Sequence, residues 1–291
     1  MLTFGFCEAR LEDHFRKIEH RNQCNPIQNI DFIYLINLDQ RPEKLAGSLA
    51  QLSPYKIHPC RFSAIYGWTL SPEVLNDVGF LFLPGMWSEE WVCHYPRGVR
   101  EFDFLTEKSE GRHFFCKFTT LGAIGCSLSH LSILQDAWDA GFETIWILED
   151  DIDVQGDPLR LSELVGKLDA LAGKEGWDIL YTDPPVELPE KKLWFLFRPD
   201  MPSLDTAPYA QRTILSEDFL KIGWRLRTHS MVVRRSGIKK ILDFEKKSGL
   251  FLPYDIELAL VPDIKLYSLR YPLVTSHTVI SDTENPHFVN R

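Results

Sequence analysis

The chain has 291 residues, 44% of them apolar, and a formal net charge of −9 at pH 7. This length allows one large α/β domain or two smaller ones, with enough apolar residues for a substantial core. The acidic balance and the absence of a basic block argue against nucleic acid as a partner. The six cysteines form neither CxxC pairs nor a compact framework, which is typical of a reducing compartment.

The first 30 residues are polar, with helical spacing only over 11–18. We predict a helical extension and linker over 1–30 and the main domain over 31–291. No apolar run approaches the length of a membrane span, and the N-terminus has no signal-peptide core. We therefore expect a cytoplasmic protein, for which peripheral contact with the inner face of a membrane stays open.

Residues 31–36 form an apolar run typical of a buried strand, and Pro42 suits the first turn of a following helix. A strand, a turn and a helix in this order are typical of the start of a doubly wound sheet. Asp39 is interpreted either as the cap of that helix or as a site residue. Asn37 and Arg41 are interpreted as nucleotide contacts, because they follow the carboxyl end of the strand.

Residues 78–118 are rich in aromatic side chains and show few signals of regular structure. Such a long irregular segment is typically a lid or a binding loop. Its rings could stack on the apolar face of a sugar, or they could pack the insertion against the body of the protein.

A helix is predicted to follow Gly122, with Leu128 and Leu131 on its apolar face. Gly125 permits close approach of another backbone, either for helix packing or for a ligand. His130 lies beside the apolar face, where it is either a buried histidine satisfied by a neighbour or a site residue.

Residues 144–148 form a short apolar run that predicts a buried strand, and Glu149, Asp150 and Asp151 follow it directly. In open α/β sheets, ligands bind beyond the carboxyl ends of the strands. Three adjacent carboxylates repel one another, and a hard divalent cation would keep them ionised. The alternative interpretation is a polar turn that closes the strand.

The second half of the chain continues the pattern of strands and helices. Strands are predicted over 177–181, which ends shortly before Asp183, and over 229–233 and 264–268, whereas 184–222 are predicted to be loops. Asp255 and Glu257 lie at the start of a short helix, where the helix dipole favours acids. The last candidate site residues along the chain are His277 and Asp282.

The order of these motifs resembles glycosyltransferase family 25, which contains lipooligosaccharide galactosyltransferases of bacteria and procollagen galactosyltransferases. The similarity extends over nearly everything from residue 31 onward, and the order and spacing of the motifs are more specific than any one of them. The segments that carry the resemblance are Ile36-Asn37-Leu38-Asp39 with Arg41, Phe62-Ser63-Ala64 with Gly67, Gly125-Cys126-Ser127-Leu128-Ser129-His130, Ile147-Leu148-Glu149-Asp150-Asp151, Trp177-Asp178-Ile179-Leu180-Tyr181, Tyr254-Asp255 and Ser281-Asp282.

The resemblance implies one GT-A type domain, with a Rossmann-like mixed central sheet flanked by helices, that binds Mn²⁺ or Mg²⁺ and a UDP-sugar donor. It implies Asp151 as a metal ligand, with Asp282 and His277 as further ligands, although Asp282 could instead serve a turn. Glu149 and Asp150 would each be a metal ligand, a contact to the ribose or a residue that supports the metal ligand. The resemblance implies that the nucleotide side is lined by Asn37, Asp39, Arg41, Ala64, Gly67, Gly125 and His130, of which Ala64 and Gly67 could act only by leaving room.

The implied reaction is the inverting transfer of a hexose, galactose or glucose, to a hydroxyl group of the acceptor. Asp255 matches the family's acidic position and is the expected general base, with Glu257 and Asp183 in reserve. Lys44 stands where relatives commonly have a second arginine, which weakens a bidentate contact there. The absence of a secretory signal and of a retention tail favours a bacterial or viral enzyme that acts on a lipopolysaccharide-type glycan. Hydroxylysine in a collagen-like protein is the alternative acceptor.

Two other functional classes compete with a glycosyltransferase. Asp151 and Asp153 after an apolar strand imitate the nucleophile motif of haloacid-dehalogenase-like phosphatases, but such a motif should follow the first strand of the core. A non-catalytic sugar-binding protein is also compatible with the same carboxylates. A calcium-binding loop is not, because Ser162 occupies the position of the bidentate glutamate and Pro158 interrupts the loop.

Overall fold

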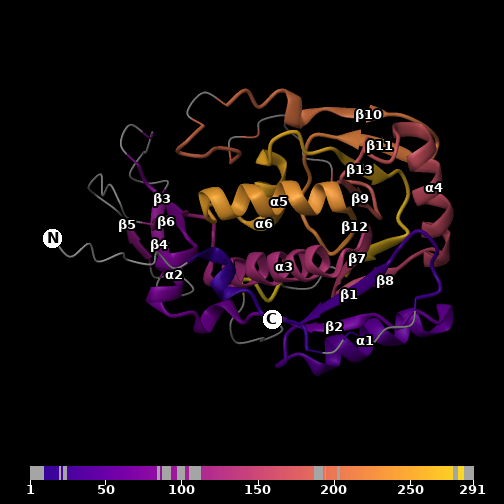
Figure 1. The fold of residues 1–291 in the computed structure, drawn as a ribbon, viewed down its shortest axis with the longest axis horizontal. Coiled ribbons are helices and arrows are strands. Elements are labelled where there is room, and N and C mark those ends of the chain that lie inside the picture. Colours follow the sequence, from indigo (N-terminus) through magenta and orange to yellow (C-terminus); the bar gives the residue numbers. More distant parts are fainter. Residues whose placement is uncertain are drawn as a thin grey trace.

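The computed structural model describes residues 10–19, 21, 25–83, 86, 93–96, 102–104, 113–186, 193, 195–201, 204–277 and 281–284, with only the backbone for 93–96 and 102–104. An eight-stranded sheet forms the centre of the fold (Figure 1). Its strands, in spatial order, are β10 (Arg212–Ile214), β11 (Phe219–Ile222), β13 (Leu266–Leu269), β9 (Ile179–Tyr181), β12 (Ser230–Arg234), β7 (Thr144–Glu149), β1 (Phe32–Asn37) and β2 (Cys60–Ser63).

The sheet is mixed. Strands β2, β1 and β7 run parallel to one another, and β9 runs parallel to β13. Strand β12 lies between these groups and is antiparallel to both β7 and β9. At the far edge β11 is antiparallel to β13 and to β10. The prediction of an α/β fold with a mixed central sheet is therefore confirmed.

Strand β7 is buried on both faces because its apolar side chains alternate between two cores. Ile145 and Ile147 pack into one hydrophobic cluster, and Trp146 and Leu148 pack into the other. All four side chains are fully buried. The strand thus presents Glu149 at a fixed position on the edge of a rigid sheet.

Helices cover both faces of the sheet. α3 (Leu121–Ala140) and α5 (Arg235–Ser248) lie side by side on one face (Figure 1), where Leu128 and Ile241 join the same cluster as Ile145. On the other face, α4 (Leu161–Ala172) and the end of α1 (Pro42–Leu52) pack against the Trp146 side. The remaining helices are the short α2 (Pro72–Val78) and α6 (Tyr254–Glu257) and the 3-10 turns η1 (Leu11–His14), η2 (Ser53–Tyr55), η3 (Gly67–Thr69), η4 (Pro158–Arg160), η5 (Pro208–Ala210) and η6 (Leu258–Leu260).

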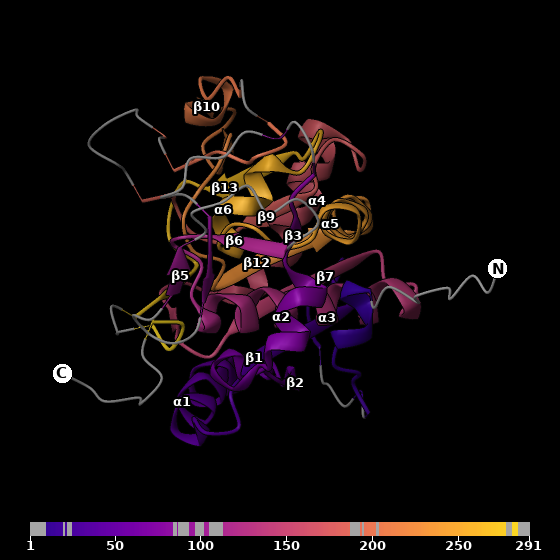
Figure 2. The ribbon, with the colours of Figure 1, turned by 90° about the vertical axis from the view of Figure 1, so that its left-hand side faces the viewer.

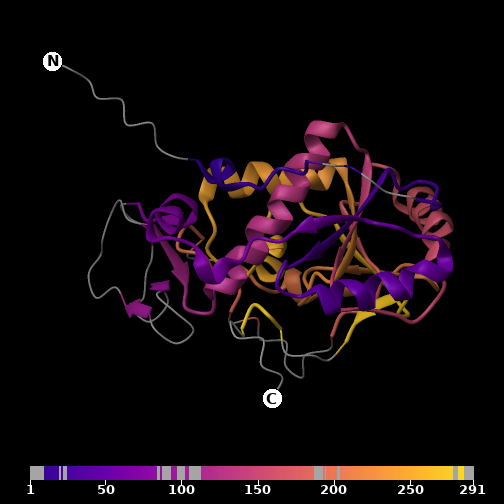
Figure 3. The same ribbon diagram turned by 90° about the horizontal axis from the view of Figure 1, so that it is seen from below.

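Two smaller sheets complete the fold. β8 (Ile152–Val154) follows the acidic cluster and pairs with β14 (Val274–Ser276), which brings the late part of the chain beside Asp151. The insertion forms an antiparallel sheet of β3 (Phe80–Leu81), β6 (His113–Cys116), β4 (Cys93–Pro96) and β5 (Phe102–Phe104), at one end of the molecule (Figures 2 and 3).

The sheet in the insertion corrects the prediction that 78–118 are irregular. Phe80 and Phe114 are buried against Phe251 and its neighbours, and Phe115 joins the core below α3. These rings pack the insertion against the body, which is the second of the two roles predicted for them. Other predicted rings lie outside the described side chains, namely Trp87, Trp91, Tyr95, Phe102 and Phe104.

The N-terminal segment contacts the body at several points, although only Leu11–His14 of the expected helix is helical. Leu11 is buried in the core. The Arg16 guanidinium donates to the carbonyl oxygens of Ser63 and Ala64. Among the described residues, no helix is long and apolar enough to cross a membrane.

Candidate functional site

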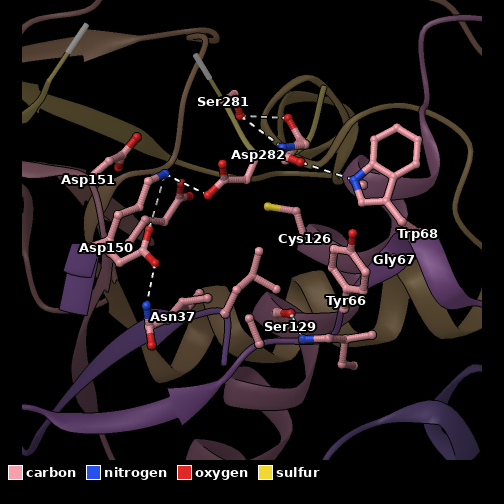
Figure 4. A pocket seen from close by; sticks show the side chains of 18 residues that line it. Asn37, Tyr66, Gly67, Trp68, Cys126, Ser129, Asp150, Asp151, Ser281 and Asp282 are labelled. Carbon is pink, nitrogen blue, oxygen red and sulfur yellow. Dashed lines mark hydrogen bonds and ion pairs between the residues drawn. The ribbon is translucent and has the colours of Figure 1, made fainter. Parts of the chain in front are cut away.

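The site lies at the edge of the sheet where β1, β2 and β7 end. Because these strands are parallel, Asn37, Ser63 and Glu149 come to the same edge. The segments that follow the strands build a pocket of about 610 Å³ (Figure 4). It is lined by Ile36, Asn37, Leu38, Lys44, Ala64, Ile65, Tyr66, Gly67, Trp68, Gly122, Cys126, Ser129, Glu149, Asp150, Asp151, Ser281, Asp282 and Thr283. We call it the first cavity.

Asn37 ties the ends of two strands together beneath the first cavity. Its buried side chain donates from Nδ2 to Asp150 Oδ2 at 2.7 Å and to the Arg41 carbonyl oxygen at 2.9 Å. Its Oδ1 accepts a bond of 2.9 Å from Arg61 Nε. Burial raises the pKa of Asp150 to about 7, despite Lys44 Nζ at 3.9 Å and the bond from Asn37. Asp150 is therefore a carboxyl group held in place by Asn37.

Glu149 is bound from two other elements. Its Oε1 accepts from His130 Nε2 on α3 at 3.0 Å and from Thr228 Oγ1, just before β12, at 2.7 Å. Burial raises the pKa of Glu149, but the bonds from His130 and Thr228 and the charge of the nearby imidazole lower it by more. The pKa of Glu149 therefore lies below the ordinary value. The His130 ring is fully buried and stacks on Tyr254 at 4.5 Å. His130 thus supports Glu149 from behind and does not line the cavity.

Asp151 is the acid in the cluster whose side chain is least satisfied. Its Oδ1 is buried and has no hydrogen-bond partner among the described residues. Burial and the neighbouring Glu149 raise the pKa of Asp151 to about 6. A buried carboxylate oxygen without a donor is costly unless a cation occupies the space beside it. The residues present therefore fit a divalent cation held by oxygen ligands, with Asp151 foremost.

Asp282 enters the first cavity from the last described segment, 281–284. Its carboxylate forms ion pairs with Arg41 and with Lys44, the latter at 2.8 Å, and its carbonyl oxygen accepts from Trp68 Nε1 at 3.2 Å (Figure 4). Asp282 therefore lies close to the acidic cluster, as expected for a residue of the same site. In this arrangement two basic side chains neutralise it, so ligation of a metal ion by Asp282 would require exchange of at least one of them.

A second, larger cavity of about 1510 Å³ adjoins the first. It is lined by Phe118, Thr120, Ala123, Cys126, Glu149, Asp151, Leu226, Arg227, Thr228, His229, Pro253, Tyr254, Asp255, Ile256, Ser276, His277, Ser281, Thr283 and Glu284. The residues that line both cavities are Cys126, Glu149, Asp151, Ser281 and Thr283. The acidic cluster thus lies where two cavities meet.

Asp255 belongs to the second cavity, at the start of α6. Its Oδ2 accepts a bond of 2.7 Å from the backbone N–H of Arg227, a residue whose φ of 71° lies in the left-handed region. Burial raises the pKa of Asp255, which the bond from Arg227 only partly offsets. His277 also lines this cavity, and its backbone N–H donates to the Asp151 carbonyl oxygen at 2.9 Å.

Six predicted site residues lie outside both cavities, namely Asp39, Arg41, Gly125, His130, Asp183 and Glu257. Glu257 is buried, pairs with Arg198 and accepts the backbone N–H groups of Phe251 and Leu252 at 3.1 and 3.2 Å. Asp183 is buried and pairs with Arg225 at 2.8 Å. Asp39 does not cap α1, as one interpretation had it, because its carboxylate binds Arg61 and Ser63 instead.

Gly67 and Gly125 act in packing. A Cβ atom on Gly67 would lie 1.8 Å from the Leu121 carbonyl oxygen, and one on Gly125 would lie 2.5 Å from the Gly67 nitrogen. The two backbones therefore meet without side chains between them. Gly67 also lines the first cavity beside Ala64, whereas Gly125 does not.

Several residues of the site escaped sequence reasoning, namely Lys44 as a partner of Asp282, Trp68, Cys126, Arg227 and Thr228. Cys126 belongs to the family-like segment 125–130, so its position in that motif could have indicated a site residue. Thr228 preceded a predicted strand, but no local pattern links it to Glu149, which is 79 positions away.

Comparison with known proteins identifies the family of the chain. Residues 30–256 match the model of glycosyltransferase family 25, described as an LPS biosynthesis protein. The chain belongs to glycosyltransferase family 25.

Animal relatives share this assignment. The chain is 26% identical over 235 residues to a glycosyltransferase 25 family member of Anopheles gambiae, covering 81% of this chain and 32% of the relative. It is 27% identical over 163 residues to inactive glycosyltransferase 25 family member 3 of Homo sapiens, covering 56% of this chain and 23% of that protein. The chain thus spans about a third or less of the length of these relatives.

Proposed function

We propose that the protein is a metal-dependent, inverting glycosyltransferase of the GT-A type that transfers a hexose, galactose or glucose, from a UDP-sugar to a hydroxyl group of an acceptor. One observation carries this proposal. Asp151, whose buried Oδ1 has no hydrogen-bond partner among the described residues, lines both cavities where they meet. A transferase needs a donor and an acceptor to meet at one point, beside the cation that holds the donor's diphosphate.

Asp151 would hold Mn²⁺ or Mg²⁺ together with Glu149 or Asp150, since hard oxygen ligands suit both ions. His277 and Asp282 are the reserve ligands. His277 lies beside Asp151, and Asp282 would first have to give up its ion pair with Lys44 or Arg41. When bound, the metal ion offsets the negative charge that develops on the departing nucleoside diphosphate.

The first cavity would take the nucleotide. It lies at the carboxyl ends of the parallel strands β1, β2 and β7, where open α/β sheets bind their ligands. Asn37 and Ala64 form its floor at the ends of β1 and β2, and Trp68 offers an aromatic surface at its wall. Arg41 and Lys44 supply positive charge for phosphate oxygens.

The second cavity would take the acceptor, with Asp255 as general base. As the acceptor oxygen attacks the anomeric carbon, the Asp255 carboxylate accepts the hydroxyl proton and the bond from the sugar to the diphosphate breaks. The raised pKa of Asp255 makes its carboxylate a stronger base than a solvated aspartate. Glu257 and Asp183 are weaker candidates, because both are engaged in ion pairs outside the cavities.

We propose a lipopolysaccharide-type glycan or glycolipid as the acceptor, based on the description of the family. A cytoplasmic protein acting on such a glycolipid would work at the inner face of a membrane. Hydroxylysine of a collagen-like protein is the alternative acceptor. The phosphatase alternative loses support, because β1 precedes β7 in the sheet and the chain matches a glycosyltransferase family.

The test is a panel of UDP-sugars, each assayed for release of UDP with and without Mn²⁺. We expect one UDP-hexose to be turned over, and Asp151→Asn to lower the metal-dependent rate on the order of 10²-fold or more. The matched control is Glu143→Gln, which removes a largely exposed acid just before the same strand. Absence of turnover with every donor would contradict the proposal.

A non-catalytic sugar-binding protein is the second candidate, and the similarity to relatives named inactive favours it. Calorimetric titration with UDP-sugars separates the two. Binding of a UDP-sugar without turnover in any acceptor mixture supports the second candidate, whereas turnover excludes it.

A further inference from the structure

We propose that Cys126, His130 and Glu149 form a second metal site, specific for a soft divalent cation such as Zn²⁺, in the wall between the two cavities. One ligand atom from each of the three side chains lies within 4.8 Å of the others. This site differs from the hard-cation site proposed at Asp151 in its sulfur and imidazole ligands and shares at most Glu149 with it, and its existence does not depend on the proposed reaction.

Two elements bring the three ligands together. Cys126 and His130 are four residues apart on α3, so both project from the same side of the helix. Glu149 meets them from the end of β7, with its Oε1 at 3.0 Å from His130 Nε2. Bonds of about 2.0–2.3 Å to a shared zinc ion need ligand atoms about 3–4 Å apart, so small side-chain rotations suffice.

The site has an open side. Cys126 lines both cavities, and Figure 4 shows its sulfur directed into the first one. An ion held by three protein ligands would keep its fourth position free toward the cavities, for water or another ligand. The cation can therefore reach the site although His130 itself is fully buried.

The donor set and the local charge favour a soft dication. Sulfur and imidazole ligands select Zn²⁺ and its analogues, whereas Mn²⁺ and Mg²⁺ prefer oxygen. Glu149, Asp255 and Asp151 lie near the Cys126 thiol, and their negative charges attract a cation. On binding, the thiol proton would pass to solvent as the metal–sulfur bond forms. The proton that His130 Nε2 shares with Glu149 would move to Nδ1 by exchange with solvent, so that Nε2 can bind the metal ion in place of its hydrogen bond to Glu149.

Occupancy would also affect catalysis, and this consequence alone rests on the proposed function. A zinc ion on Glu149 would stand beside the cation at Asp151 and repel it. We therefore expect Zn²⁺ to inhibit the Mn²⁺-dependent reaction instead of supporting it.

The test is a titration of the full chain with Cd²⁺, followed by the ultraviolet charge-transfer band of cadmium thiolate, and then displacement by Zn²⁺. We expect Cys126→Ser to abolish the Cys126 part of the band and to weaken Zn²⁺ binding at least about tenfold. Cys60→Ser is the matched control, because Cys60 is a cysteine on β2 that lies away from the site. The control should bind as the wild type does.

Asp151→Asn separates this site from the proposed function. It should abolish Mn²⁺-dependent turnover but keep the Cd²⁺ band, and turnover need not be observed for the band to be measured. If Cys126→Ser fails to fold, as judged by circular dichroism, Glu149→Gln serves as the second variant with the same expected weakening of Zn²⁺ binding. A Cd²⁺ band and a Zn²⁺ affinity that stay at the wild-type level in a folded variant would overturn the inference.

Discussion

Asn37 donates a hydrogen bond of 2.7 Å to Asp150 and so joins the end of β1 to the acidic turn after β7. The same amide group donates to the Arg41 carbonyl oxygen and accepts from Arg61. One buried side chain therefore connects the floor of the first cavity, the start of α1 and the acidic cluster.

Replacement of this amide should cost stability. Asn37→Ala removes the buried hydrogen bonds from the amide to the Asp150 carboxylate and to the Arg41 carbonyl oxygen, so we expect the free energy of unfolding to fall by about 1–3 kcal/mol. Urea unfolding measures the change. Asn76→Ala, which alters an exposed asparagine on α2, is the control and should change stability much less. Equal losses in both variants would show that the Asn37 network is energetically unimportant.

Replacement by alanine should have opposite effects at Gly125 and at Gly47, two glycines that lie in helices. Gly125→Ala places a methyl group 2.5 Å from backbone atoms, so we expect destabilisation by about 1–3 kcal/mol. Gly47→Ala meets nothing within 4 Å on α1 and should stabilise the protein by about 0.5–1 kcal/mol. Thermal unfolding of the two variants compares them directly, and stabilisation by Gly125→Ala would refute the close contact.

Glu245 on α5 predicts a pH dependence of stability. Both carboxyl oxygens are buried without a partner among the described residues, and burial raises the pKa of Glu245 well above the ordinary value of 4.5. The folded protein thus holds this proton more tightly than the unfolded chain. Its contribution to stability is fully present below about pH 4.5 and is lost as the pH rises through the folded pKa.

Glu245→Gln should therefore stabilise the protein at about pH 8 more than at about pH 4. Urea unfolding at several pH values measures the difference between variant and wild type. Glu175→Gln, at an exposed position, should show no such trend. A stability difference independent of pH in Glu245→Gln would contradict the argument.

Asp255 provides the kinetic prediction. Asp255→Asn keeps the size of the side chain but removes the base, so we expect kcat to fall about 10²- to 10⁴-fold, with little change in KM for the donor. Steady-state kinetics with the UDP-sugar that the donor panel selects measure both constants. Asp243→Asn, an exposed acid on α5, is the control. A rise in donor KM at unchanged kcat would assign Asp255 to binding.

Local sequence patterns predicted the elements that the hydrophobic core defines. β1 and β7 followed from apolar runs that are buried on both faces, and Pro42 correctly marked the start of α1. The edge strands β10 and β11 were predicted as loops, because β10 is exposed and has no apolar face to form a pattern. The insertion sheet was missed for a related reason, since its aromatic residues follow no clear alternation.

The sequence predicted the site residues that lie at the ends of strands. It did not predict those whose positions depend on segments far away in the chain. Glu149 to Asp151 and Asn37 follow strands directly, so sheet geometry alone placed them together. Glu257 looked equivalent to Asp255, two positions earlier, but the structure turns it toward Arg198 and away from the second cavity. That difference depends on a partner 59 positions away, which no local pattern reveals.

The place of β12 beside β7 has a consequence for how the protein is made. The backbone N–H of Glu149 donates to the His229 carbonyl oxygen, and Thr228 binds the Glu149 side chain. A growing chain on the ribosome therefore carries the acidic triplet long before the segment that holds it in place has been synthesised. Until that late segment has been synthesised, Glu149 lacks both of these partners, so the site reaches its final arrangement only late in synthesis.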